Sequence, residues 1–95
     1  MYIQGNGISI HYQIDGPEDA PTVVLSHSLA ANLGMWDAQM STLLPRFRVL
    51  RYDTRGHGQT DAPSGNYTLE LLARDLFSLM DGLAIDAVHF VGLSM

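Results

Sequence analysis

Hydrophobic and polar positions along the chain follow the period of a β-strand in several short segments. Residues 8–14 alternate between apolar and polar side chains, which is typical of a half-buried strand. Residues 2–3 lie on the other side of Asn6-Gly7. Because Asn-Gly favours a tight turn, we expect these two segments to form an antiparallel hairpin. The continuous apolar run at residues 22–25 is typical of a strand that is covered on both faces, as in a parallel sheet.

Two other segments follow the period of an α-helix. The first covers residues 33–44, with apolar side chains at helical spacing, and Pro45 is expected to end it. The second covers residues 69–83 and has one continuous apolar face. Thr68 precedes this second segment and is a suitable N-cap, while Gly82 is placed to stop the helix.

Two further apolar runs, at residues 47–52 and 87–91, complete the pattern. We expect both to be strands, the second one buried, with His89 as a core histidine. Strands that alternate with helices after an initial hairpin predict an α/β fold, with a mostly parallel sheet and helices on its faces. The sequence has no repeats, low-complexity stretches or internal boundaries, so residues 1–95 are interpreted as part of a single domain.

The composition disfavours several classes of function. The net charge of −5 argues against nucleic acid and anionic membranes as partners, because both require a basic face. There is no cysteine, and the four histidines have no carboxylate or thiol neighbours at metal-ligand spacing, so we expect no disulfide and no metal site. The first residues lack the pattern of a signal peptide and no apolar run is long enough to cross a membrane, which favours a cytoplasmic protein.

The last four residues match most of a sequence motif for a catalytic serine. Gly92-Leu93-Ser94-Met95 supplies four of the five positions of Gly-x-Ser-x-Gly, the nucleophile elbow, in which a serine projects from a sharp turn between a strand and a helix. The same letters also occur in ordinary turns at strand ends. A second segment favours the catalytic interpretation, because a loop of small residues follows the strand at residues 22–25. Ser94 is therefore the candidate nucleophile.

A nucleophile of this kind needs backbone N–H groups that stabilise the negative oxygen of the tetrahedral intermediate. Met95 follows the nucleophile directly and is one candidate donor. Leu29, which follows His27-Ser28 in the loop after residues 22–25, is the other.

Four stretches then carry a family resemblance: His27-Ser28-Leu29, residues 33–40, residues 47–58 and residues 92–95. In order and spacing they resemble the N-terminal part of the α/β-hydrolase superfamily. Within it, the chain is most similar to the 3-oxoadipate enol-lactonases of bacterial aromatic catabolism. Ser28 stands where many members of the superfamily have glycine, which is similar to the enol-lactonase pattern.

The resemblance implies an α/β-hydrolase fold, with residues 1–95 as the N-terminal portion of its core domain. It also implies a Ser-Asp-His triad in that chain order, without a cofactor. Only Ser94 of this triad is present, because the acid and the base follow the nucleophile. The histidines that precede Ser94 are therefore not expected to be the catalytic base: His11, His27, His57 and His89. We predict that residues 1–95 alone are inactive and that the remainder of the hydrolase is a partner, for example as a second chain.

The implied reaction is hydrolysis of a small carboxylic ester or lactone, with conversion of 3-oxoadipate enol-lactone to 3-oxoadipate as the specific case. The residues that bind the substrate stay unassigned. An aryl esterase or perhydrolase of the same fold is one alternative. A non-catalytic ligand-binding protein is another, because a fold alone does not establish catalysis. Epoxide hydrolases and haloalkane dehalogenases are disfavoured, because their pattern has aspartate where this chain has Ser94.

Several polar residues near these motifs are interpreted as structural. His27 is expected to be a loop residue that hydrogen-bonds to the backbone. Asp53 and Arg55 are placed where they could bind the carboxylate of an anionic lactone, but the resemblance implies a structural role, in which the pair ties down the glycine-rich turn at residues 56–58. Arg51 and the neighbouring arginines are interpreted as surface charges.

Overall fold

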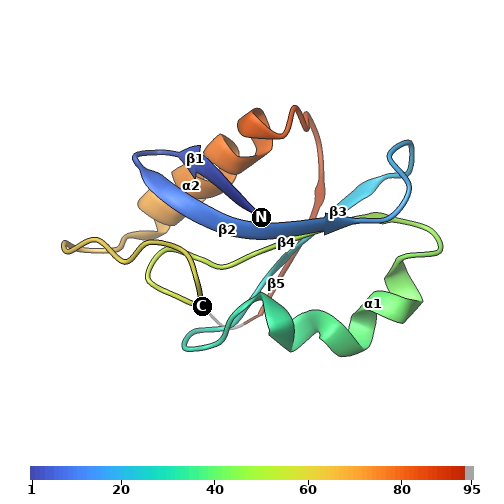
Figure 1. Ribbon diagram of the computed structural model, residues 1–95, viewed down its shortest axis with the longest axis horizontal. Coiled ribbons are helices and arrows are strands. Elements are labelled where there is room, and N and C mark those ends of the chain that lie inside the picture. Colours follow the sequence, from blue (N-terminus) through green and yellow to red (C-terminus); the bar gives the residue numbers. More distant parts are fainter. Residues whose placement is uncertain (94–95) are drawn as a thin grey trace.

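A five-stranded sheet forms the centre of residues 1–93, the part of the chain that the computed structural model describes (Figure 1). Its strand order is β1-β2-β4-β3-β5. The first two strands form the expected antiparallel hairpin, β2 is also antiparallel to β4, and β3 is parallel to both β4 and β5. The strands are β1 (Tyr2–Gly5), β2 (Ile8–Asp15), β3 (Thr22–Ser26), β4 (Arg48–Tyr52) and β5 (His89–Gly92).

The hairpin turn follows from its two central residues. Asn6 and Gly7 have φ angles of 50° and 81°. Positive φ at both central positions is the geometry of the two-residue turn that matches the twist of paired strands, and Asn-Gly adopts it most readily. The predicted hairpin is therefore confirmed.

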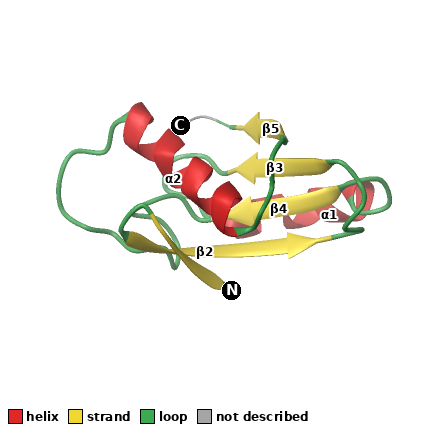
Figure 2. Cartoon of the chain, turned by 90° about the horizontal axis from the view of Figure 1, so that it is seen from above, coloured by secondary structure: helices red, strands yellow, loops and turns green. Residues whose placement is uncertain are grey.

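The helices lie on opposite faces of the sheet, with α2 on one side and α1 on the other (Figure 2). The first predicted helix begins as a 3₁₀ turn, η1 (Leu33–Trp36), and continues as α1 (Asp37–Leu43). The second is α2 (Leu69–Gly82), where the Thr68 side chain accepts a hydrogen bond from the Leu71 N–H, so the predicted N-cap is confirmed. No helix within residues 1–93 combines the length and apolarity needed to cross a membrane.

Side chains of the central strands alternate between two cores. Val24 of β3 and Leu50 of β4 point to one face and pack with Leu79 of α2. Val23 of β3 and its neighbours point to the other face and pack with Met40 of α1. Burial of each such side chain contributes about 1.5–3 kcal/mol. The continuous apolar runs are explained by this arrangement, because each central strand is covered on both faces.

The expectation of a buried fifth strand does not hold within residues 1–93. All four residues of β5 are exposed, including His89, which is therefore not a core histidine. The physical reason is the strand order. Within the described residues β5 pairs only with β3 and forms one edge of the sheet, and neither hydrophobic core includes its side chains.

Arg51 also differs from its expected place on the surface. It is buried, and its guanidinium donates to Asp37 Oδ1 and to Gln13 Oε1, each at 2.6 Å. Arg51 lies on β4, between Gln13 of β2 and Leu25 of β3 in the sheet register. A side chain at the centre of a sheet is covered by its neighbours, and a charged one then needs polar partners.

The isolated 95-residue chain is expected to self-associate, because an exposed apolar edge strand pairs readily with another chain. Phe90 and Val91 are 54% and 43% exposed on β5. Sedimentation velocity over a concentration series should show oligomers that grow with concentration. The Val91→Lys variant places a charge on the edge and should shift the distribution toward monomer. A wild-type chain that stays monomeric at the highest concentration would contradict the expectation.

Candidate active site

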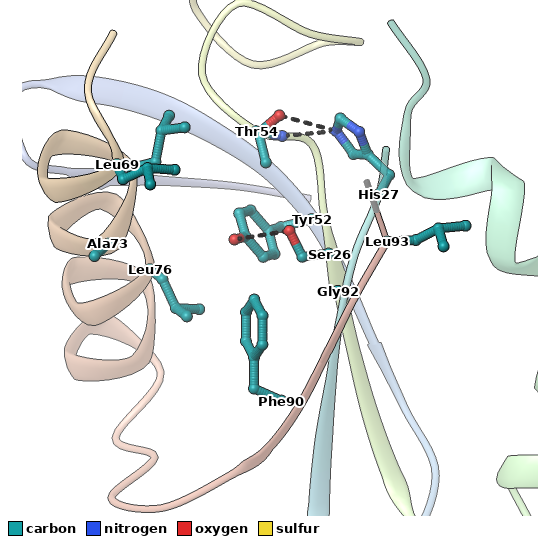
Figure 3. A pocket seen from close by; sticks show the side chains of 11 residues that line it. Ser26, His27, Tyr52, Thr54, Leu69, Ala73, Leu76, Phe90, Gly92 and Leu93 are labelled. Atoms are coloured by element: carbon teal, nitrogen blue, oxygen red, sulfur yellow. Dashed lines mark hydrogen bonds between the residues drawn. The ribbon is translucent and has the colours of Figure 1, made fainter. Parts of the chain in front are cut away.

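A cavity of about 290 Å³ lies where β3, β4 and β5 end, between the sheet and α2 (Figure 3). Ligands of open α/β sheets bind outside the carboxyl ends of the strands, so this is the expected place for an active site. The lining combines apolar side chains of α2 with a small polar group at the strand ends. The lining residues are Ser26, His27, Tyr52, Thr54, Leu69, Leu72, Ala73, Leu76, Phe90, Gly92 and Leu93.

His27 is the most constrained polar group of this lining. It is 1% exposed, its Nδ1 lies 2.8 Å from the Ser28 carbonyl oxygen, and its Nε2 accepts the Thr54 N–H at 2.9 Å. A carbonyl oxygen only accepts and a backbone N–H only donates, so the ring carries its proton on Nδ1 and is neutral. Burial lowers the pKa of His27, the Ser28 hydrogen bond opposes this, and the nearby His57 lowers it further. The expected structural role, bonded to the backbone, agrees with these contacts.

Acidification is expected to destabilise the fold through His27. Burial holds the pKa of His27 below the ordinary value of about 6.5, so below that pH the unfolded chain binds a proton more readily than the folded chain does. The contribution of His27 to the free energy of unfolding is therefore fully present above about pH 6.5. It falls at lower pH by at most about 1.4 kcal/mol per pH unit. Urea unfolding of dilute protein, followed by the fluorescence of Trp36, should show this loss between pH 7 and pH 5. His27→Gln should have a smaller loss, and the exposed His89→Gln is the matched control. An equal loss in all three proteins would contradict the assignment.

Asp53 connects the loops that lie next to the cavity. It is 2% exposed and accepts hydrogen bonds from the Leu33 N–H at 2.7 Å and the Gln59 N–H at 2.9 Å, with His11 Nδ1 also at 2.9 Å. Burial alone would raise the pKa of Asp53, but these bonds outweigh it and hold the pKa below the usual range. Asp53 thus joins β2, the turn that it was expected to tie down, and the segment that begins η1.

Arg55 pairs with Asp75 and not with Asp53, so the two residues do not tie down the turn at residues 56–58 as a pair. Its Nε and Nη2 donate to both carboxylate oxygens of Asp75, at 2.9 and 2.8 Å. The hydrogen bonds to Asp75 raise the pKa of the Arg55 guanidinium. Asp75 also accepts from the Asn6 side chain at 2.8 Å, so the pair connects the hairpin turn, the loop after β4 and α2.

Sequence reasoning missed Asp75, although a signal for it exists. Asp75 is buried at the helical spacing of Leu72, Leu76 and Leu79, within the apolar face of α2. A charged residue at such a position needs a buried partner of opposite charge.

Within residues 1–93, no group of three or more His, Asp or Glu side chains is arranged to hold a metal ion.

Substitution of Gly58 is expected to disrupt the corner around Asp53. Gly58 has a φ of 50°, and an added Cβ would collide with the carboxylate of Asp53. Gly7 has a φ of 81° but open space around its Cα. Gly7→Ala should therefore cost only the backbone strain, about 1 kcal/mol, whereas Gly58→Ala adds the collision and should cost at least about 2 kcal/mol more. Urea unfolding measures both, and equal losses would contradict a steric role of Asp53.

Two of the three residues predicted for catalysis, Ser94 and Met95, lie outside the described residues. The structure does place the segments that lead to them. Gly92, at the end of β5, pairs with Ser26, at the end of β3, and the Leu93 N–H donates to the Ser26 carbonyl oxygen at 3.2 Å. The Gly-x-Ser segment and the loop that contains Leu29 therefore start side by side at the edge of the cavity.

Leu29, the third predicted residue, lies in the loop after β3, and its side chain is exposed. It lines a neighbouring cavity of about 210 Å³ with Arg55, His57 and Tyr67. The two cavities share the Leu69 and Leu72 side chains, so they adjoin at the first turn of α2.

Comparison with known proteins places this arrangement in a family. Residues 21–95 match the sequence model of the α/β hydrolase fold family. The 3-oxoadipate enol-lactonase 1 of Acinetobacter baylyi is 47% identical over 95 residues, which are 100% of this chain and 35% of that enzyme. A bifunctional esterase/perhydrolase of Acinetobacter calcoaceticus is 32% identical over 90 residues, 94% of this chain and 33% of that protein.

A solved structure shows the same fold. The enol-lactonase of Burkholderia xenovorans LB400 matches with a TM-score of 0.97 and 52% identity, over 100% of this chain and 37% of that one. The chain thus spans about a third of the length of the relatives that it matches. Because the family match covers most of the chain and the fold agrees throughout, the chain belongs to the α/β hydrolase fold family.

Proposed function

We propose that the chain works as the N-terminal third of a serine hydrolase that acts on a carboxylic ester or lactone, with Ser94 as the nucleophile. The observation that carries the proposal is the meeting of two segments at Ser26. The pairing of Ser26 with Gly92 and the bond from Leu93 bring the Gly-x-Ser segment beside the loop of Leu29, at the carboxyl ends of the strands. An ester hydrolase needs a nucleophile and backbone donors at such a point.

The proposed mechanism divides the work between this chain and the rest of the hydrolase. The Ser94 hydroxyl attacks the carbonyl carbon, and its proton passes to a histidine that an aspartate orients, both supplied outside residues 1–95. The N–H groups of Leu29 and Met95 stabilise the oxyanion, each by a few kcal/mol. Collapse of the intermediate breaks the bond to the leaving oxygen, which takes the proton. Water then hydrolyses the acyl-enzyme.

For the substrate we propose 3-oxoadipate enol-lactone, which is hydrolysed to 3-oxoadipate. The proposal is supported by the similarity to two enol-lactonases, from Acinetobacter baylyi and Burkholderia xenovorans, which are 47% and 52% identical over the whole chain. The cavity next to the strand ends is mainly apolar, with a few polar side chains at one side, which suits a small organic ester or lactone. These polar residues are Ser26, His27, Tyr52 and Thr54.

A second candidate is an aryl esterase or perhydrolase with the same nucleophile. Its support is the similarity to the esterase/perhydrolase of Acinetobacter calcoaceticus. The two candidates share the serine mechanism and differ in the acyl group that the cavity accepts.

The test uses a chimera, called the completed hydrolase below, in which residues 1–95 replace the matching third of the Acinetobacter baylyi enol-lactonase. The ratio of kcat/KM for the enol-lactone to kcat/KM for an aryl acetate is measured in the chimera and in the unmodified enzyme. We expect both proteins to prefer the lactone to a similar degree. A chimera that prefers aryl acetate would favour the second candidate. A folded chimera without hydrolytic activity would contradict the proposed function.

A further inference from the structure

The His27 ring touches the peptide group that carries the proposed oxyanion donor. Its Nδ1–H donates to the carbonyl oxygen of Ser28 at 2.8 Å. That carbonyl and the Leu29 N–H belong to one peptide group. In a trans peptide the C=O and N–H bonds point in opposite directions, so fixing the oxygen also fixes the direction of the N–H.

The ring is itself held from the opposite side. The Thr54 N–H donates to Nε2 at 2.9 Å, and Thr54 Oγ1 lies 3.2 Å from the same nitrogen (Figure 3). Thr54 follows β4, whereas His27 follows β3. The ring therefore connects the loop of Leu29 to the neighbouring strand end through both of its nitrogens.

The loop needs such support because its backbone is strained. Ala30 has a φ of 63°, which is unfavourable for a residue with a Cβ. The remaining bond to the Ser28 oxygen comes from the Ala31 N–H at 3.1 Å and closes a four-residue turn. Among the hydrogen bonds within residues 1–93, none uses the Leu29 N–H as donor.

We propose that His27 is a positioning residue for the oxyanion site: its neutral ring, protonated on Nδ1, holds the Ser28–Leu29 peptide so that the Leu29 N–H meets the developing negative charge. The inference rests on the proposed function. It gives His27 a role in the transition state, beyond packing in the loop and distinct from that of a general base.

Two amide variants of the completed hydrolase separate the contacts of the two ring nitrogens. The amide of Asn reaches the place of Nδ1 and can donate to Ser28 O, whereas the amide of Gln reaches the place of Nε2 and can accept from Thr54. If the Ser28 contact positions the donor, His27→Gln should lower kcat about 100-fold with KM nearly unchanged, because the lost interaction exists only in the transition state. His27→Asn should stay within about fivefold of the wild-type kcat.

A purely structural role makes a different prediction for kcat. Each variant loses one of the two ring contacts, so both variants should show similar falls in Tm under either role. If the role of His27 were only structural, their kcat values should be similar as well. Equal kcat losses in the two variants, or an effect confined to KM, would overturn the inference. Ser94→Ala in the same protein separates this failure from that of the proposed function, because turnover that survives Ser94→Ala contradicts the serine mechanism itself.

A spectroscopic measurement tests the ring without relying on turnover. Two-bond ¹H–¹⁵N correlation spectra of the completed hydrolase, with His27→Asn to assign the signal, should show Nδ1 protonated and Nε2 unprotonated at neutral pH. A ring protonated on Nε2 alone could not donate to Ser28, and this result would overturn the inference.

Discussion

Replacement of Ser94 with alanine is expected to lower kcat of the completed hydrolase by at least about 10⁴-fold, because the variant cannot form the acyl-enzyme. The remaining groups of such a site still bind the substrate and stabilise the oxyanion, so a small rate above that of water should survive. Substrate binding should change little. Steady-state hydrolysis of the enol-lactone gives kcat, and titration of the inactive variant with substrate gives Kd.

The matched control for this substitution is Ser41→Ala. Ser41 is exposed on α1, which lies on the other face of the sheet from α2, so its hydroxyl has no part in the proposed site. It should retain wild-type turnover. If Ser94→Ala kept more than a few per cent of the activity, another group would be the nucleophile. Tight binding of a ligand by a chimera without turnover would instead favour the non-catalytic class of protein.

Local sequence patterns predicted the hairpin and the two central strands correctly. Asn6-Gly7 determines its own turn, and the apolar runs that became β3 and β4 need only the presence of a sheet with both faces covered. These features depend on residues that are close together in the sequence, and the hydrophobic periodicity of a segment reflects only such residues.

The features that were missed depend on partners that lie far apart in the chain. The exposure of β5 follows from the strand order, and the burial of Arg51 follows from the position of β4 between two other strands. The partner of Arg55 is Asp75, on an element that the local pattern had assigned only an apolar role. The local pattern shows that Asp75 interrupts the apolar face of α2, but it does not show which residue is its partner.

The candidate site was also predicted only in part, since the motifs were found from the sequence but the cavity and the contacts of His27 were not. The Gly-x-Ser pattern indicated Ser94, and the loop after β3 indicated Leu29. The cavity itself arises because the order β4-β3-β5 brings three strand ends together under α2. The contribution of His27 depends on the Thr54 backbone, 27 residues away, which no local motif encodes.

Removal of one partner of the Arg55–Asp75 pair should give the largest loss of stability. Arg55 and Asp75 are buried and share two hydrogen bonds, so either Arg55→Met or Asp75→Leu leaves a buried charge without its partner. We expect each to lower the free energy of unfolding by about 3 kcal/mol, the lower end of the range for buried pairs, since Arg55 also borders a cavity. Urea unfolding of dilute protein, followed by Trp36 fluorescence, measures the losses.

The double variant Arg55→Met/Asp75→Leu provides the decisive comparison. It removes both charges together and replaces them with apolar side chains of similar length, so no unpaired charge remains. Such replacements are often close to neutral, and the double variant should therefore be more stable than either single variant. The exposed pair of Arg74 and Glu70, one helical turn apart on α2, is the matched control, and its disruption should cost less than about 0.5 kcal/mol. Additive losses in the Arg55 and Asp75 variants would show that the two side chains stabilise the fold independently, and the pair would then not be the connection between the hairpin turn, the loop after β4 and α2.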